Sequence, residues 1–196
     1  MYPASFHYLA PTSLDEAIGL LKQHGDEAKI LAGGHSLIPT MKLRLAQPSV
    51  LIDLAGVAGL QGIREEGGNI VIGAMTTHTE VAESAVVRSK LAALAESAEQ
   101  VGDSQVRNRG TIGGSVAHAD PNADEPVSLS AFEATFTLVG PSGRRQVAAK
   151  DFFIDVFTTD LQPDEVLTEI TVPAPAGASA YSKMRHLSLI HISEPT

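Results

Sequence analysis

The chain has 196 residues, which is enough for one domain or two small ones with a real hydrophobic core. With 43% hydrophobic and 19% charged residues, its composition is that of a globular protein. The net charge of −9 argues against nucleic-acid binding, which depends on Lys and Arg that neutralise phosphates. An anionic ligand would have to be held by local N–H groups, because the overall field repels it.

Cysteine is absent, and this excludes disulfides, thiolate-bound iron–sulfur clusters and sulfur-based zinc sites in the chain. No apolar run approaches the roughly 18 residues that a membrane helix needs. The first residues lack the basic and then apolar pattern of a secretory signal. We therefore expect a cytoplasmic protein without a membrane span.

The first part of the chain, residues 1–57, has the pattern of a small α/β unit. Ser13 and Glu16 have the spacing of a capping box, and apolar residues follow at helical intervals. The expected elements are a helix that stops at Gly25, a strand at 28–31, a helix at 36–45 that contains Pro39, and a strand at 50–54.

From residue 58 to about 176 the pattern changes to α+β with an antiparallel sheet. Gly67-Gly68-Asn69 separates two apolar runs and predicts a hairpin. His78 is interpreted as a residue at the start of a short helix. The other expected elements are an alanine-rich helix that includes 91–95 and ends near Gly102, a helix at 125–131, and strands at 134–139, 145–147 and 165–172.

Two glycine pairs, each followed by a hydroxyl residue, are the main functional signal. Glycine allows positive φ and a close approach of the backbone to a ligand, and successive N–H groups in such a turn form an anion site. One such turn suits one phosphate, and two suit the pyrophosphate of a dinucleotide. The first segment is Ala32, Gly33, Gly34, His35 and Ser36, and the second is Thr111, Ile112, Gly113, Gly114 and Ser115.

Simpler interpretations exist for these residues. Either glycine pair alone suits a tight turn without a ligand. The neighbours His35 and Ser36 do not predict a hydrolase, because adjacent side chains rarely face each other and the chain has no G-x-S-x-G elbow.

The charged residues near the second glycine segment are also open to more than one interpretation. His118, Asp120 and Asp124 suit a loop that lines a cofactor, a solvated acidic loop or, as the weakest of the three, a metal site. Arg107 and Arg109 either attract a pyrophosphate or a partner, or anchor a turn by hydrogen bonds to carbonyl groups.

Residues 32–39 and 106–121 resemble the two flavin-binding signatures of the FAD subunits of molybdenum hydroxylases, the family of carbon monoxide, xanthine and aldehyde dehydrogenases. The resemblance extends over about residues 1–185. It implies an α+β fold of the vanillyl-alcohol oxidase (PCMH) type, with two FAD-binding subdomains at 1–57 and 58–176. The resemblance fades after residue 185, and we interpret 177–196 as the start of a truncated or non-native C-terminal segment.

The resemblance also implies roles for individual residues. The segments Gly33–Ser36 and Thr111–Gly114 would bind the FAD pyrophosphate, with Ser115 nearby. His118 and Asp124 match positions near the adenosine half, where an acidic group accepts from ribose hydroxyls. Leu167 matches an apolar position near the ring systems, and Lys183 a basic position close to the cofactor.

The implied function is electron transfer. An iron–sulfur small subunit would deliver electrons, a molybdopterin large subunit would oxidise the substrate, and FAD on this chain would pass the electrons to an external acceptor. Two alternatives are a stand-alone FAD oxidase of the same fold and a non-catalytic nucleotide-binding module.

Overall fold

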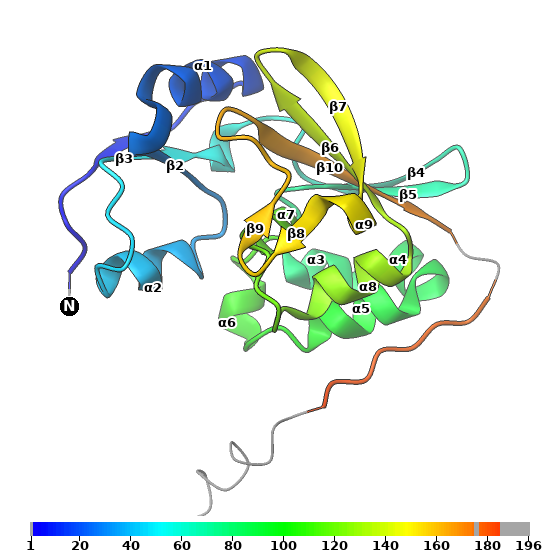
Figure 1. The fold of residues 1–196 in the computed structure, drawn as a ribbon. Helices are drawn as coiled ribbons and strands as arrows, with labels where there is room; N and C mark the ends of the chain where they lie inside the picture. The colour runs from blue at the N-terminus through cyan, green and yellow to red at the C-terminus, as the bar shows by residue number, and fades with distance from the viewer. Residues whose placement is uncertain (1, 175–176, 185–196) are drawn as a thin grey trace, which may run out of the picture.

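The computed structural model describes residues 2–174 and 177–184 (Figure 1). The fold contains a three-stranded parallel sheet near the N-terminus and a five-stranded antiparallel sheet, with a layer of helices that covers one face of the larger sheet. The smaller sheet and its helices lie beside the larger unit (Figure 1). The expected mixture of helices and antiparallel strands is therefore present.

The small unit contains the strands β1, β2 and β3 in the order β1-β3-β2, with α1 above the sheet and α2 below it in Figure 1. The short β1 was not predicted, because its pattern has only three residues and its pairing partner lies far along the chain. The elements are β1 (His7–Leu9), α1 (Leu14–His24), a 3₁₀ turn (Gly25–Glu27), β2 (Ala28–Leu31), α2 (Leu37–Lys42), β3 (Val50–Asp53) and a 3₁₀ turn (Leu54–Gly56).

The start of α1 follows the predicted cap with one difference. The Ser13 hydroxyl accepts a hydrogen bond from the Glu16 backbone N–H at 3.2 Å. The Glu16 carboxylate accepts from the backbone N–H of Thr12 at 2.9 Å, one residue before the position expected for a capping box. Gly25 ends the helix with a φ of 51°, as its position predicts.

The larger sheet has the strand order β4-β5-β10-β6-β7, so its central strand is the last one in the sequence. Gly67 and Gly68, at φ values of 58° and 84°, form the two-residue turn of the predicted first hairpin. The strands are β4 (Ile63–Glu66), β5 (Asn69–Gly73), β6 (Thr135–Gly140), β7 (Gly143–Ala148) and β10 (Val166–Pro173).

Helices form the layer that covers this sheet (Figure 1). The predicted alanine-rich helix is split in two at Leu91 and ends at Glu99, earlier than expected. The remaining elements are α3 (His78–Glu83), α4 (Ala85–Lys90), α5 (Ala92–Glu99), α6 (Ser104–Arg107), α7 (Ile112–His118), α8 (Asp124–Ala131), α9 (Ala149–Phe152), β8 (Phe153–Asp155) and β9 (Thr158–Thr159).

Two hydrophobic cores hold the fold together. The larger one lies between the five-stranded sheet and the helices, with Phe136, Ile170 and Leu94 among its fully buried members. The smaller one joins α1 to the parallel sheet and also takes in Leu60 and Val166 from beyond residue 57. Because these two side chains pack on the small unit, the small unit and the larger one share buried apolar surface. The division at residue 57 stays a prediction.

Candidate functional site

The two glycine segments, far apart in the sequence, meet in space. A Cβ built on Gly33 would lie 2.3 Å from the Arg109 carbonyl oxygen and 2.6 Å from the Gly110 Cα. A Cβ built on Gly114 would lie 3.6 Å from the Ala32 Cβ. Only a residue without a side chain fits against the backbone of Arg109 and Gly110, and the glycine at position 33 therefore lets the small unit contact the turn that precedes α7.

The first segment is a turn with free hydrogen-bond donors. Gly34 has a φ of 79°, and the carbonyl groups of Gly34 and Ser36 accept from the start of α2, at 3.0 Å from the Ile38 N–H and 3.2 Å from the Thr40 N–H. Within the described residues, no acceptor is recorded for the backbone N–H groups of positions 33–36. These positions are half-buried or exposed, so four successive amides are available to an anion.

The second segment differs from the predicted turn, because it is the first turn of helix α7. Thr111 is the N-cap, and its hydroxyl accepts from the Gly114 N–H at 3.2 Å. Neither Gly113 nor Gly114 has a positive φ. The sequence suggested a turn because two adjacent glycines disfavour a helix, whereas this helix is stabilised by its cap and by tertiary contacts.

Those tertiary contacts occupy the donors of the segment. The Ile112 N–H donates to the Thr76 carbonyl at 3.0 Å, and the Gly113 N–H donates to the Ala74 carbonyl at 2.9 Å. Gly114 and Ser115 are half-buried, and Gly114 faces Ala32 of the first segment. The two segments therefore contribute differently: the first offers free amides, and the second offers the surface of α7 at Gly114, which carries no side chain.

Asp124 and Lys183, both predicted near the cofactor, form an ion pair. Lys183 Nζ lies 2.8 Å from Oδ2 of Asp124, and the Tyr181 hydroxyl donates to Oδ1 at 2.6 Å. Asp124 is the first residue of α8 and is buried, so these contacts attach the segment 177–184 to the helical layer. The sequence pattern held no signal for Tyr181, because its partner lies far away along the chain.

Tyr181 makes this attachment sensitive to alkali. Burial and, next, the hydrogen bond to Asp124 raise the pKa of Tyr181 from 10.0 to about 12. A pKa raised by folding stabilises the folded form fully below about pH 10, and this stabilisation is lost as the pH rises through about 12. We expect the difference in tyrosinate absorbance between the native chain and Tyr181→Phe to titrate near pH 12. A difference that titrates near pH 10 would contradict the buried contact.

The other predicted site residues lie around α7. His118, near the C-terminal end of α7, is half-buried, and its ring packs on Phe157 with the ring centres 5.0 Å apart. Leu167 lies in β10 and packs into the larger core, being only 5% exposed. Arg107 donates to the carbonyl groups of Val101 and Gly102 at 3.0 and 3.1 Å, so its guanidinium anchors the turn.

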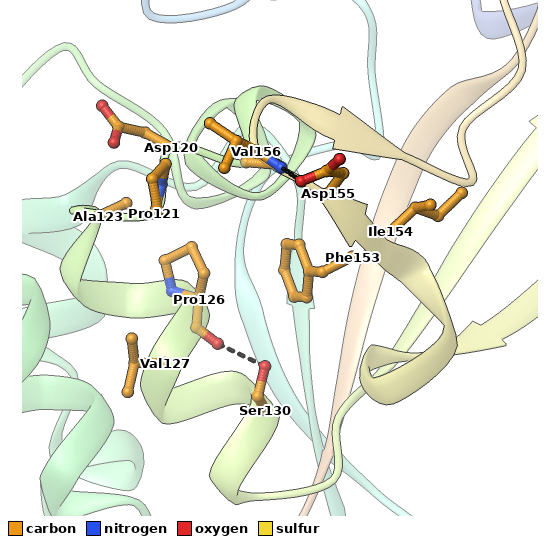
Figure 2. A pocket seen from close by; sticks show the side chains of 11 residues that line it. Asp120, Pro121, Ala123, Pro126, Val127, Ser130, Phe153, Ile154, Asp155 and Val156 are labelled. Atoms are coloured by element: carbon orange, nitrogen blue, oxygen red, sulfur yellow. Dashed lines mark hydrogen bonds between the residues drawn. The ribbon is translucent and has the colours of Figure 1, made fainter.

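A cavity of about 400 Å³ lies beyond the C-terminal end of α7 (Figure 2). Its walls come from the α7–α8 turn, α8 and β8, and Phe153 and Pro126 point into it (Figure 2). No residue of the two glycine segments lines it. The described residues contain no group of three or more His, Asp or Glu side chains placed to hold a metal ion.

The sequence did not predict a buried pair, His78 and Glu125, close to the turn that precedes α7. Nδ1 of His78 lies 2.9 Å from Oε2 of Glu125, and both side chains are almost completely enclosed. His78 is the first residue of α3, as expected, but its burial and its contact with Glu125 depend on tertiary packing, because α3 and α8 both pack against α5. Among the helices in residues 2–174 and in the segment 177–184, none is long and apolar enough to cross a membrane.

One known protein family matches most of this chain. Residues 4–175 match the family described as the FAD binding domain in molybdopterin dehydrogenase. The carbon monoxide dehydrogenase medium chain of Hydrogenophaga pseudoflava is 51% identical over 187 residues, which are 94% of this chain and 65% of that relative. The xanthine dehydrogenase FAD-binding subunit of Escherichia coli O157:H7 is 30% identical, over 87% of this chain and 58% of that relative.

Solved structures have the same fold. Carbon monoxide dehydrogenase from Hydrogenophaga pseudoflava superposes with a TM-score of 0.88 at 53% identity. The match covers 90% of this chain and 61% of the chain in that structure. Quinoline 2-oxidoreductase from Pseudomonas putida 86 superposes with a TM-score of 0.87 at 39% identity, over 90% of this chain and 61% of that one. The predicted α+β, PCMH-type FAD-binding fold is confirmed.

The chain spans less than two thirds of the length of these relatives. The family match nevertheless extends over most of the chain and includes both glycine segments. The chain therefore belongs to the family of FAD-binding domains of molybdopterin dehydrogenases.

Proposed function

We propose that this chain binds FAD at the contact between the two glycine segments and acts as the electron-transfer subunit of a molybdenum hydroxylase. The observation that carries the proposal is the row of four free amides at 33–36, beside a helix wall that has no side chain at Gly114. Free backbone donors of this kind suit the charge and the shape of a pyrophosphate. They also let an acidic protein hold an anion without basic side chains.

The residues present fit the cofactor in two respects. The amides of the first segment are unpaired within the described residues and accessible, so a diphosphate would satisfy them without breaking existing hydrogen bonds. A Cβ at Gly114 would project toward Thr111 and Ala32, on the side of α7 that faces the first segment. We propose that Ala32 and the residues at 33–36 hold the diphosphate from one side and those at 111–115 from the other.

The remaining site residues have proposed roles around this centre. His118 and Asp124 would contact the adenosine half, Leu167 would provide apolar surface close to the rings, and Lys183 would lie near the cofactor. Each Asp124 oxygen already accepts one hydrogen bond, and a carboxylate oxygen has a second lone pair. Asp124 can therefore keep Tyr181 and Lys183 while it accepts from a ribose hydroxyl.

The proposed partners follow from the relatives and from the composition. A cysteine-free chain cannot ligate iron–sulfur clusters, so an iron–sulfur small subunit would carry them and a molybdopterin large subunit would oxidise the substrate. Bound FAD would supply the ability to take single electrons and to pass on pairs. We further propose a cytoplasmic location for the complex.

Titration of the purified chain with FAD tests the proposal. We expect saturation at one FAD per chain, with the visible absorbance of bound oxidised flavin. Because the glycine segments are proposed to bind the diphosphate, ADP should displace FAD more effectively than AMP or riboflavin. Equal competition by AMP and ADP would contradict the binding of the diphosphate by the glycine segments, and a chain that takes up no FAD would refute the proposed function.

Co-purification with cysteine-rich and molybdenum-containing subunits tests the role in electron transfer against that of a stand-alone oxidase.

A further inference from the structure

We infer that His78 and Glu125 are positioning residues. They hold the backbone of Arg109 and Gly110 in the position in which it packs against Gly33. This inference rests on the proposed function, because the surface that they support is the proposed FAD cradle. Neither residue belongs to the glycine segments or to the predicted site. The two side chains would act through the backbone of the turn, without contact with the cofactor.

The pair is deeply buried. The Glu125 side chain is fully enclosed and that of His78 is 5% exposed, with Nδ1 and Oε2 2.9 Å apart. The pair is close in distance, but among the described residues no well-directed hydrogen bond reaches His78 Nδ1 or either Glu125 carboxylate oxygen. Burial of polar groups with incomplete hydrogen bonding is costly, so the surrounding structure must hold these side chains in place.

The imidazole ring of His78 packs directly against Gly110. A Cβ built on Gly110 would lie 2.7 Å from both Cδ2 and Nε2 of the ring. The His78 backbone N–H also donates to the Gly110 carbonyl at 3.1 Å. His78 thus touches this turn with both its ring and its backbone, and there is no space for another atom between them.

Gly110 links the His78 ring to the first glycine segment. Its Cα lies 2.6 Å from the position of a Cβ built on Gly33. The order in space is therefore Glu125, His78, Gly110 and Gly33, from the start of α8 to the turn with the free amides. Because every layer is in close contact, a change in the position of the ring is transmitted to the distance between the two glycine segments.

The decisive variant replaces the pair with apolar residues, as His78→Leu together with Glu125→Leu. Both substitutions remove buried polar atoms that lack well-directed hydrogen bonds, and the burial of such atoms is costly to a fold. We expect the apoprotein to keep its melting temperature, whereas the Kd for FAD rises about tenfold or more, as is typical when the support of a site is removed. The conservative variant Glu125→Gln keeps the size and the polarity of the side chain that contacts Nδ1 of His78, and it should bind FAD like the native chain.

Phe152→Leu is the matched control, because it loosens the larger core at a fully buried ring and should lower the melting temperature without changing the Kd for FAD. Native FAD affinity in the stable double variant would overturn the inference. If the double variant does not fold, His78→Gln answers the same question, since it removes the ring below Gly110 and keeps a polar group near Glu125. Native affinity in that variant would also overturn the inference. Failure of the native chain to bind FAD would refute the proposed function instead.

Discussion

Gly33→Ala is expected to abolish the retention of FAD, with the Kd raised about a hundredfold or more, as a displacement of about 1 Å in a positioned site can cause. The added Cβ would lie 2.3 Å from the Arg109 carbonyl oxygen and 2.6 Å from the Gly110 Cα. Both neighbours are backbone atoms and cannot rotate away. The small unit and the α7 turn must therefore separate, and the free amides move away from the wall that faces them.

The measurement is an FAD titration followed by flavin fluorescence, together with thermal unfolding of the apoprotein. Gly19→Ala is the matched control, because Gly19 lies on α1 with no atom within 4 Å of its built Cβ. That change should leave FAD binding intact and stabilise the helix by up to about 1 kcal/mol. Native stoichiometry and affinity in Gly33→Ala would show that the contact between the segments does not form the site.

The neighbours Gly113 and Gly114 are expected to respond to alanine in different ways. A Cβ on Gly113 would lie 2.5 Å from both the Cβ and the carbonyl oxygen of Ala74, inside the packed interior. Gly113→Ala should therefore destabilise the fold by about 1–3 kcal/mol, as overpacking does. A Cβ on Gly114 meets Thr111 Oγ1 at 2.9 Å and then Ala32 Cβ at 3.6 Å, so the fold has room to adjust.

Gly114→Ala should accordingly lose less stability than Gly113→Ala, because only the Thr111 hydroxyl has to shift, and it should lose affinity for FAD, because the new methyl group narrows the proposed cradle. Chemical denaturation measures the first property, and FAD titration the second. Each variant is the control for the other, since both place alanine at neighbouring positions of the same helix. Full FAD affinity in Gly114→Ala would remove the second segment from the proposed binding site.

Local signals were sufficient to predict much of the fold. The cap at Ser13, the stop at Gly25 and the turn at Gly67-Gly68 act over a few residues, and the structure contains all three. Helix α7 could not be predicted in this way, because two glycines oppose a helix that the carbonyl groups of Ala74 and Thr76 support from another part of the chain.

In the candidate site, too, local sequence signals could be predicted and tertiary contacts could not. The motifs identified the glycine segments and the family, because their flanking residues are long and specific. They gave no indication of the contact between His78 and Glu125 or of that between Asp124 and Tyr181, since each joins residues distant in sequence. The sequence also could not show that the amides of one segment are free and those of the other engaged, because that depends on tertiary contacts.

The position of β10 at the centre of the larger sheet affects the order of events during synthesis on the ribosome. Its neighbours β5 and β6 pair with it and not with each other, so both lack their inner partner until the chain has been translated through Pro173. The parallel sheet needs only residues up to Asp53. Nascent chains would therefore expose the inner edge of β5 from Gly73 to Pro173, joined by that of β6 from Gly140 onward, and this is the stage at which protection by a chaperone matters most.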